Sequence, residues 1–156
     1  MRNLAVIPIL LGAVALAQAA SAQNMPAPVN QSDIKWGPAP PIVQPGAKLA
    51  VISGDMTKPG PFVFRLQLPA NYKIAAHHHS NTEYVTIISG TFHLGMGDKL
   101  DESKGLALKA GGFAEAPAKM NHYAWTGNEP AEVQIQSTGP FDLIYVNPAD
   151  DPSKKQ

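Results

Sequence analysis

The stretch of sequence that decides the fold covers residues 75–90 and reads AAHHHSNTEYVTIISG. It places three histidines and Glu83 within seven residues, and a run rich in β-branched residues then leads to Gly90. Imidazole nitrogens and carboxylate oxygens are ligands that divalent transition metals accept. The stretch therefore predicts two neighbouring β-strands that carry a metal site.

The composition limits the kind of protein that surrounds this stretch. The chain has 156 residues, 44% hydrophobic and 15% charged, which favours one folded domain. The formal net charge is zero, so there is no basic field to attract nucleic acid. Fifteen prolines and 13 glycines favour a turn-rich, all-β chain. Cysteine is absent, which excludes disulfides, thiol nucleophiles and cysteine-type zinc sites.

Short segments of alternating hydrophobicity, separated by turn residues, continue on both sides of the opening stretch. Phe62, Phe64 and Leu66, for example, share one face of a strand. Many short strands at close spacing predict a β-sandwich or β-barrel, and no helix is expected. The predicted strands cover residues 48–53, 62–68, 72–79, 83–89, 91–96, 106–109, 113–116, 122–126, 132–137 and 141–146.

The N-terminal residues 1–22 have the pattern of a secretory signal peptide. Arg2 supplies a positive charge, residues 4–17 are apolar, and a small-residue cleavage site ends at Ala22. The apolar segment is too short to be a good membrane span. We therefore expect no stable membrane anchor and a periplasmic or secreted bacterial protein whose mature chain begins at Gln23.

Three further parts follow the predicted signal peptide. Residues 23–44 are rich in proline and predict an extended N-terminal arm, with Trp36 and Ile42 anchoring it on the barrel or on a second subunit. Residues 45–148 form the predicted barrel domain. Residues 149–156 are rich in Pro, Asp and Lys and predict a flexible tail.

Strand parity sorts the three neighbouring histidines. His77 and His79 are two residues apart and point to one face, together with Lys73 and Ala75, whereas His78 points to the other. The opposite face also takes the residues Tyr72, Ile74 and Ala76. An interior site could then combine two imidazoles from one strand with the Glu83 carboxylate from the next strand.

A fourth ligand would come from one of the two remaining histidines. His122 follows a Gly- and Pro-containing turn at the start of an alternating strand, whereas His93 lies between Phe92 and Leu94 in a short strand. His122 has the clearer turn-to-strand context. For His93 an interior position, next to the ligands or the substrate, remains an alternative to an ordinary surface position.

At these residues the sequence resembles the cupin superfamily. The first cupin motif reads G-x5-H-x-H-x3,4-E-x6-G, and His77, His79, Glu83 and Gly90 fit it, with Asn71 in place of the first glycine. Asparagine tolerates the left-handed backbone conformation that a glycine would supply.

The second cupin motif reads G-x5-P-x-G-x2-H-x3-N. Gly111, Pro117 and His122 fit it, whereas Lys119 replaces the second glycine and Thr126 replaces the asparagine. The resemblance covers roughly residues 46–147 and is strongest to small, single-domain, exported bacterial cupins. It implies a jelly-roll β-barrel of six to eight strands with one metal inside, held by His77, His79, Glu83 and His122. Relatives hold Fe, Mn, Ni, Cu or Zn in such sites, and the ligands alone do not select one.

Several other residues have weaker signals. Tyr123 and Trp125 lie on the face opposite His122, which predicts packing or a subunit contact rather than a place in the pocket. The charged segment 98–104 predicts a solvated loop. For Arg65 an ordinary exposed position on its strand is favoured over a place in the pocket. By the same weak parity argument three more polar residues are possible pocket groups: Gln134, Gln136 and Tyr145.

Two kinds of function are compatible with this sequence. The first is a metal-dependent enzyme on a small chelating substrate, with dioxygenase-like redox chemistry favoured over an isomerase or lyase because no separate general base is visible. The second is a non-enzymatic periplasmic module that binds or senses a small molecule or a metal. Cupins of this size commonly dimerise, so a homodimer is expected in either case.

Overall fold

The computed structural model describes residues 27–154. The predicted signal peptide at 1–22, the first arm residues 23–26 and the last tail residues 155–156 lie outside the described residues. Within 27–154 the secondary structure consists of short strands and three short 3-10 helices. In chain order these are η1 Gln31–Asp33, β1 Gly37–Pro38, β2 Lys48–Ser53, β3 Gly60–Leu68, β4 Lys73–His78, β5 Glu83–Ser89, β6 Thr91–Met96, β7 Leu106–Lys109, β8 Phe113–Ala116, β9 His122–Thr126, β10 Ala131–Gly139, β11 Ile144–Tyr145, η2 Pro148–Asp150 and η3 Pro152–Lys154.

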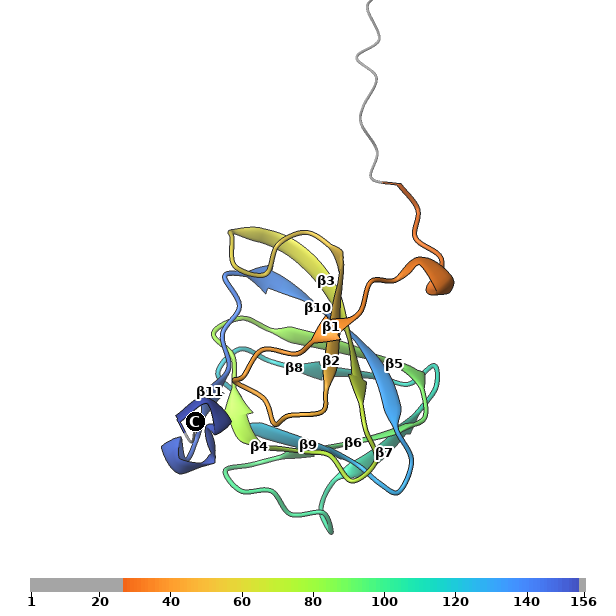
Figure 1. Ribbon diagram of the computed structural model, residues 1–156. Coiled ribbons are helices and arrows are strands. Elements are labelled where there is room, and N and C mark those ends of the chain that lie inside the picture. The colour runs from red at the N-terminus through yellow and green to blue at the C-terminus, as the bar shows by residue number, and fades with distance from the viewer. Residues whose placement is uncertain (1–26, 155–156) are drawn as a thin grey trace, which may run out of the picture.

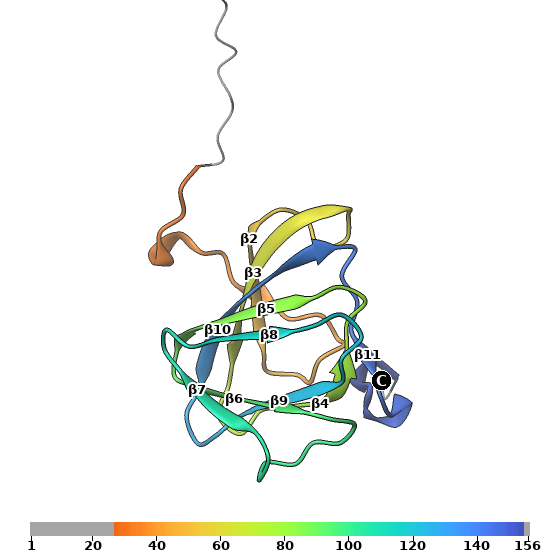
Figure 2. The same cartoon turned by 180° about the vertical axis from the view of Figure 1, so that it is seen from behind.

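The strands form two antiparallel sheets that face each other (Figures 1 and 2). One sheet has the order β1-β2-β3-β10-β5-β8 and the other the order β11-β4-β9-β6-β7. Strands adjacent in the chain, such as β4 and β5, often lie in opposite sheets, so the chain crosses repeatedly between the two layers. This arrangement confirms the predicted all-β jelly-roll.

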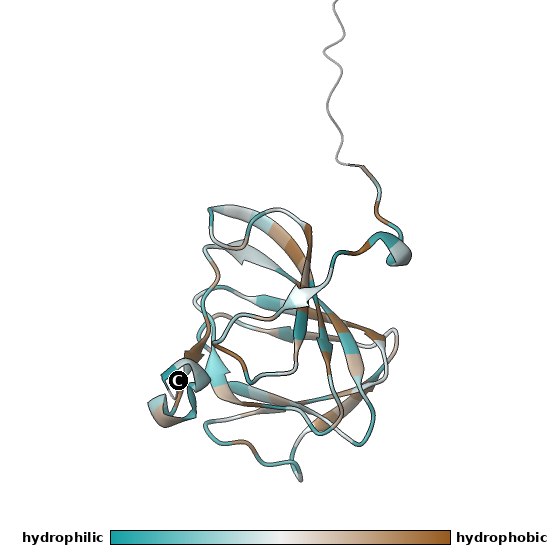
Figure 3. Ribbon diagram, viewed as in Figure 1, coloured by the Kyte–Doolittle hydropathy of each residue, from teal (hydrophilic) through white to brown (hydrophobic). Residues whose placement is uncertain are grey.

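The core lies between the two sheets because apolar residues alternate along the strands. Figure 3 shows hydrophobic and hydrophilic segments following one another along the ribbons. Phe62 and Phe64 on β3, Val85 and Ile87 on β5 and Val133 on β10 are each at most 5% exposed. Burial of a side chain of this size stabilises the fold by roughly 1.5–3 kcal/mol. The predicted alternation of residues 62–68 is therefore confirmed, and the face that carries Phe62 and Phe64 is the one that points to the core.

The predicted and observed strands differ most near the C-terminus. The strand predicted at 141–146 is reduced to Ile144–Tyr145. The backbone of the preceding residues makes other bonds: Phe141 donates its N–H to the carbonyl of Met56, and the Asp142 carbonyl accepts from His79. Side-chain alternation does not reveal these bonds, so the prediction was too long.

The second half of the predicted arm lies on the barrel. Gly37 and Pro38 form β1, which pairs with β2. The sequence did not predict β1, because proline is tolerated in a sheet only at its edge. The carbonyl of Ile42 accepts a hydrogen bond of 2.8 Å from the Tyr145 hydroxyl. Ile42 is thus an anchor on the barrel, and Trp36 is half-buried. Within residues 27–154 no helix has the length and hydrophobicity needed to cross a membrane.

Candidate metal centre

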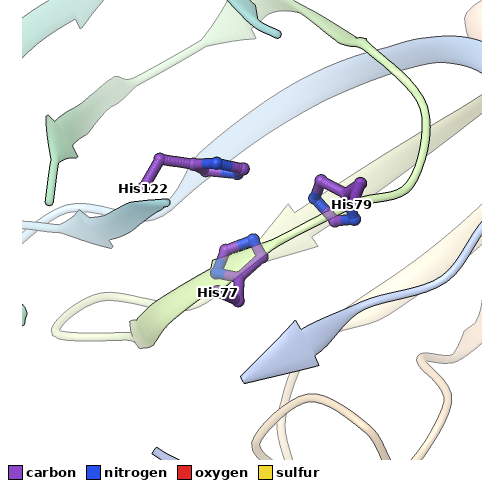
Figure 4. Close-up of side chains that lie close together, drawn as sticks. All are labelled: His77, His79 and His122. Carbon is purple, nitrogen blue, oxygen red and sulfur yellow. The ribbon is translucent and has the colours of Figure 1, made fainter. Parts of the chain in front are cut away.

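Three buried histidines converge between the two sheets (Figure 4). His77 and His78 are the last two residues of β4, His79 follows directly, and His122 is the first residue of β9. Their ring centroids are 4.3 Å apart for His77 and His122, 4.9 Å for His77 and His79, and 5.2 Å for His79 and His122. One nitrogen of each ring lies within 4.8 Å of the other two. All three are at most 4% exposed, so the structure brings three imidazoles together in the interior.

A β-bulge in β4 turns His77 inward. Ile74 pairs with Ala124 and His77 pairs with His122, so β4 has one residue more than β9 between these two pairs. An extra residue shifts every later side chain to the opposite face. The prediction that Ile74 faces away from His77 was therefore wrong: both border the same interior cavity. Strict alternation applied only after the bulge, where His77 and His79 share the inner face.

Each histidine is oriented by a backbone carbonyl. Nδ1 of His77 bonds to the carbonyl of Ala75 at 2.8 Å and Nδ1 of His122 to that of Met120 at 2.9 Å. Nδ1 of His79 bonds to the carbonyl of Asp142. A carbonyl can only accept, so each Nδ1 carries the proton, and Nε2 of the neutral ring has a free lone pair. This is the tautomer in which three imidazoles can bind a metal.

Glu83 lies beside these rings at the start of β5. Its carboxylate is buried, on the same inner face as Val85 and Ile87. Oε2 is 3.4 Å from Nε2 of His122 and 3.6 Å from Nε2 of His79. Both of these Nε2 atoms are buried without a hydrogen-bond partner among the described residues. Since a lone pair facing a carboxylate is unfavourable, the site requires a positive charge between them, from a proton or a metal ion.

The pKa values agree with such a centre. Burial and the neighbouring rings His122 and His79 lower the pKa of His77 to about 3, which keeps this ligand neutral. Burial alone would lower the pKa of His79, but Glu83 outweighs it and raises this pKa. Burial also acts to raise the pKa of Glu83, yet His122 and His79 hold it well below its ordinary value. The donor set therefore fits a divalent cation, which would supply the positive charge that the site requires.

Two cavities flank the centre. An inner void of about 30 Å³ borders His77, Glu83 and His122. An outer cavity of about 230 Å³ borders His77, His79 and Glu83. The outer cavity is also bordered by Pro40, Ile42, Phe141, Asp142 and Leu143. The sequence did not predict a place in the site for these residues and predicted only that Ile42 anchors the arm.

His78 and His93 lie outside the centre. His78 faces outward and its Nδ1 bonds to Oδ1 of Asn121 at 3.0 Å, as parity predicted. His93 stacks on Trp125 with ring centroids 4.8 Å apart. Tyr123 and Trp125 pack on the outer side of the second sheet, where Leu100 of the predicted solvated loop covers them, so packing is their role in this chain.

The candidate pocket groups are mostly not in the pocket. Arg65 forms an ion pair of 3.2 Å with Glu132 and donates a hydrogen bond of 3.1 Å from Nε to Oε1 of Gln134, on the outer face of the first sheet. Gln136 is exposed. These three residues lie outside the pocket, as the favoured reading of Arg65 predicted, because Phe62 and Phe64 occupy the inner face of β3. The Tyr145 ring lies 6.1 Å from that of His77, but neither cavity borders it.

The similarity of this chain to known proteins is a similarity of fold. No protein-family model matches this chain, and no curated protein matches its sequence. An RmlC-like cupin protein from Ralstonia eutropha matches with a TM-score of 0.58 at 16% identity over 75% of this chain and 71% of its own.

The chain has the cupin fold.

Two enzymes share this cupin fold. The polyketide cyclase RemF from Streptomyces resistomycificus matches with a TM-score of 0.65 at 17% identity over 83% of this chain and 92% of its own. The DMSP lyase DddQ from Ruegeria pomeroyi matches with a TM-score of 0.58 at 14% identity over 73% of this chain and 61% of its own. At such identities the likeness concerns the architecture, and the chemistry must be argued from the centre itself.

Proposed function

We propose that this cupin holds one divalent transition metal through His77, His79, His122 and Glu83 and acts as a dioxygenase-like oxidoreductase on a small chelating substrate. The observation that carries the proposal is the set of three oriented imidazoles whose Nε2 atoms meet beside a buried carboxylate. Three nitrogens and one oxygen leave two positions of an octahedral ion for other ligands. Fe, Mn, Cu, Ni and Zn all accept this donor set.

The surroundings favour redox chemistry over proton transfer. Among the described residues that border the two cavities, Asp142 is the one titratable group outside the proposed ligands. Its carboxylate accepts bonds from both the N–H and the hydroxyl of Ser80, so it is not free to act as a general base. A bound metal would supply the activation of O2, and both oxygen atoms would enter the substrate without a separate reductant.

The chain contributes orientation and exclusion of water. The carbonyls of Ala75, Met120 and Asp142 fix the three rings, and apolar side chains of both sheets surround them. A site with little water strengthens electrostatic interactions with a bound substrate. The two enzymes with this fold, a polyketide cyclase and a DMSP lyase, act on small molecules, which supports a small-molecule substrate here.

The test combines metal analysis with oxygen consumption. Protein isolated from its native compartment should contain Fe, Mn or Cu at one ion per chain by mass spectrometry. It should consume O2 with a member of a panel of catechols and β-diketones, and His122→Ala should lose both properties. Zinc at the same stoichiometry, with tight ligand binding and no turnover, would contradict the enzyme and support a non-enzymatic binding or sensing module.

We also propose export and dimerisation. The signal-peptide pattern of residues 1–22 supports a periplasmic or secreted protein, and sequencing of the mature N-terminus should find Gln23. An exposed aromatic pair, Tyr84 and Phe113, with centroids 6.3 Å apart, supports a contact between two copies. Sedimentation should give twice the chain mass, and Phe113→Lys should shift it toward the monomer.

A further inference from the structure

The outer cavity is the larger of the two cavities beside the centre. The inner void of about 30 Å³ has room for about one water molecule and is otherwise enclosed by hydrophobic residues of both sheets. The outer cavity of about 230 Å³ borders three of the four proposed ligands. A molecule that contacts the metal must therefore occupy the outer cavity, whose walls decide which molecules fit.

These walls are apolar and fixed. One is the turn of the N-terminal arm, where Val43 donates its N–H to the carbonyl of Pro40 at 3.1 Å and Tyr145 holds the carbonyl of Ile42. Another wall includes Phe141, whose ring stacks on His79 with centroids 4.4 Å apart and an interplanar angle of 19°. Such walls favour a flat, apolar body next to the ligands.

Within the part of the chain that the structure describes, the cavities offer no cationic side chain to a substrate. None of the described residues that border either cavity is a lysine or an arginine. Glu83 and Asp142 are the acidic residues that border the outer cavity, and the Asp142 carboxylate accepts a hydrogen bond from the N–H of Ser80. A carboxylate or phosphate on the substrate, beyond the oxygens that bind the metal, would meet apolar walls and no cationic side chain of residues 27–154, which disfavours its binding.

We infer that the substrate of this site is a neutral, largely apolar molecule of about one ring that presents one or two oxygen donors to the metal. This inference rests on the proposed metal centre and names its substrate class. A cavity of about 150 Å³ can hold a benzene molecule and drug-sized ligands occupy about 300–1,000 Å³, so 230 Å³ suits one substituted ring.

The test measures binding of three probes to the metal-loaded protein by titration calorimetry. Catechol is neutral and has one ring, protocatechuate adds a carboxylate to the same chelating oxygens, and dihydroxynaphthalene adds a second ring. Catechol should bind about tenfold more tightly than either of the others. Protocatechuate binding as tightly as catechol would overturn the inference.

Two variants test the walls themselves. Met56→Lys places a cation at the cavity and should shift the preference about tenfold toward protocatechuate. Val51→Lys, at an exposed position on β2 that does not border the cavity, is the matched control and should keep the preference for catechol. Ile42→Ala enlarges the cavity and should improve binding of dihydroxynaphthalene relative to catechol.

Metal content, measured on every sample, separates this inference from the proposed function. Protein that takes up no metal contradicts the metal centre and, with it, the substrate class. Protein with one metal ion per chain that prefers protocatechuate, or that binds no probe, contradicts the substrate class alone.

Discussion

His77 on β4 and His122 on β9 are direct partners in the antiparallel ladder, with ring centroids 4.3 Å apart. Both project from the same sheet toward the core, where Glu83 reaches them from the opposite sheet. The candidate metal centre therefore links the two layers of the barrel. Metal binding should depend on the register of the strands as well as on the ligand residues.

The two adjacent histidines His77 and His78 should differ sharply in metal binding. His77→Ala removes a ring that faces the centre, so we expect the bound metal to fall from one ion per chain to a small fraction. His78→Ala, which removes an outward ring bonded to Asn121, should keep the full complement. Mass spectrometry of both variants after dialysis measures this. Metal loss in His78→Ala alone would contradict the proposed ligand set.

The bulge in β4 should be required for the centre. Deleting Ala75 removes the extra residue, so His77 and His79 should turn to the outer face if the earlier part of the strand keeps its register. We expect a β-rich far-ultraviolet spectrum together with loss of bound metal. A deletion variant that still binds one ion would show that the part of β4 before the bulge has shifted its register against β9.

Removal of metal should lower the stability of the protein. A ligand that binds only the folded state stabilises it by about 2.7 kcal/mol at a free concentration of about 100 Kd. For a chain of this size that corresponds to a fall in Tm of roughly 10 °C after chelation. Scanning calorimetry with and without chelator measures the shift. His122→Ala serves as the control, and a chelator effect of equal size in that variant would contradict a stabilising ion at this centre.

Lys119→Gly should stabilise the fold. Lys119 occupies a second-motif position where cupins have glycine, and its backbone has φ +64°. The left-handed conformation costs a non-glycine residue roughly 1–2 kcal/mol, part of which returns as extra freedom of glycine in the unfolded chain. We expect a gain of about 0.5–1 kcal/mol in urea unfolding. Lys99→Gly, in an exposed loop, is the control and should give no gain.

Alkaline pH should destabilise the fold through Tyr145. Burial, with the charges of Asp151 and Asp150, raises the pKa of Tyr145 to about 12 from 10.0. Below about pH 10 the Tyr145 hydroxyl keeps its proton in both the folded and the unfolded state, and its contribution to the free energy of unfolding is fully present. Between about pH 10 and 12 the hydroxyl ionises in the unfolded state but not in the folded state, so the free energy of unfolding falls.

A Tyr145→Phe variant tests this pH dependence. The variant should lose about 1 kcal/mol near neutral pH, because the bond to the Ile42 carbonyl is absent, yet show a weaker further loss above about pH 10. Urea unfolding across this range measures both effects. A pH profile parallel to that of the wild type would contradict the assignment to Tyr145.

Local sequence patterns predicted most strands well. Residues 83–89, 91–96, 106–109, 113–116 and 122–126 form strands with the predicted bounds, because turn residues delimit them and alternation marks their buried face. Asn71 adopts φ +58°, the left-handed conformation predicted for it at the first motif position. A pocket position for Arg65, Gln134 and Gln136 was only a weak alternative, because parity gives two faces but does not say which one faces the core, and the structure places none of them in the pocket.

The sequence by itself determined the all-β class, the alternation of His77 and His79 against His78, and the candidate ligands, since each depends on residue types a few positions apart. Only the tertiary structure decided that Ile74 and His77 share a face, that Phe141 and Asp142 border the cavity, and that the arm closes it at Ile42. These features depend on an unpaired extra residue and on contacts between segments about 100 residues apart in the chain, such as Tyr145 with Ile42 at a separation of 103. Strand register and long-range contacts are set by the packed fold, and a local pattern of residues does not encode them.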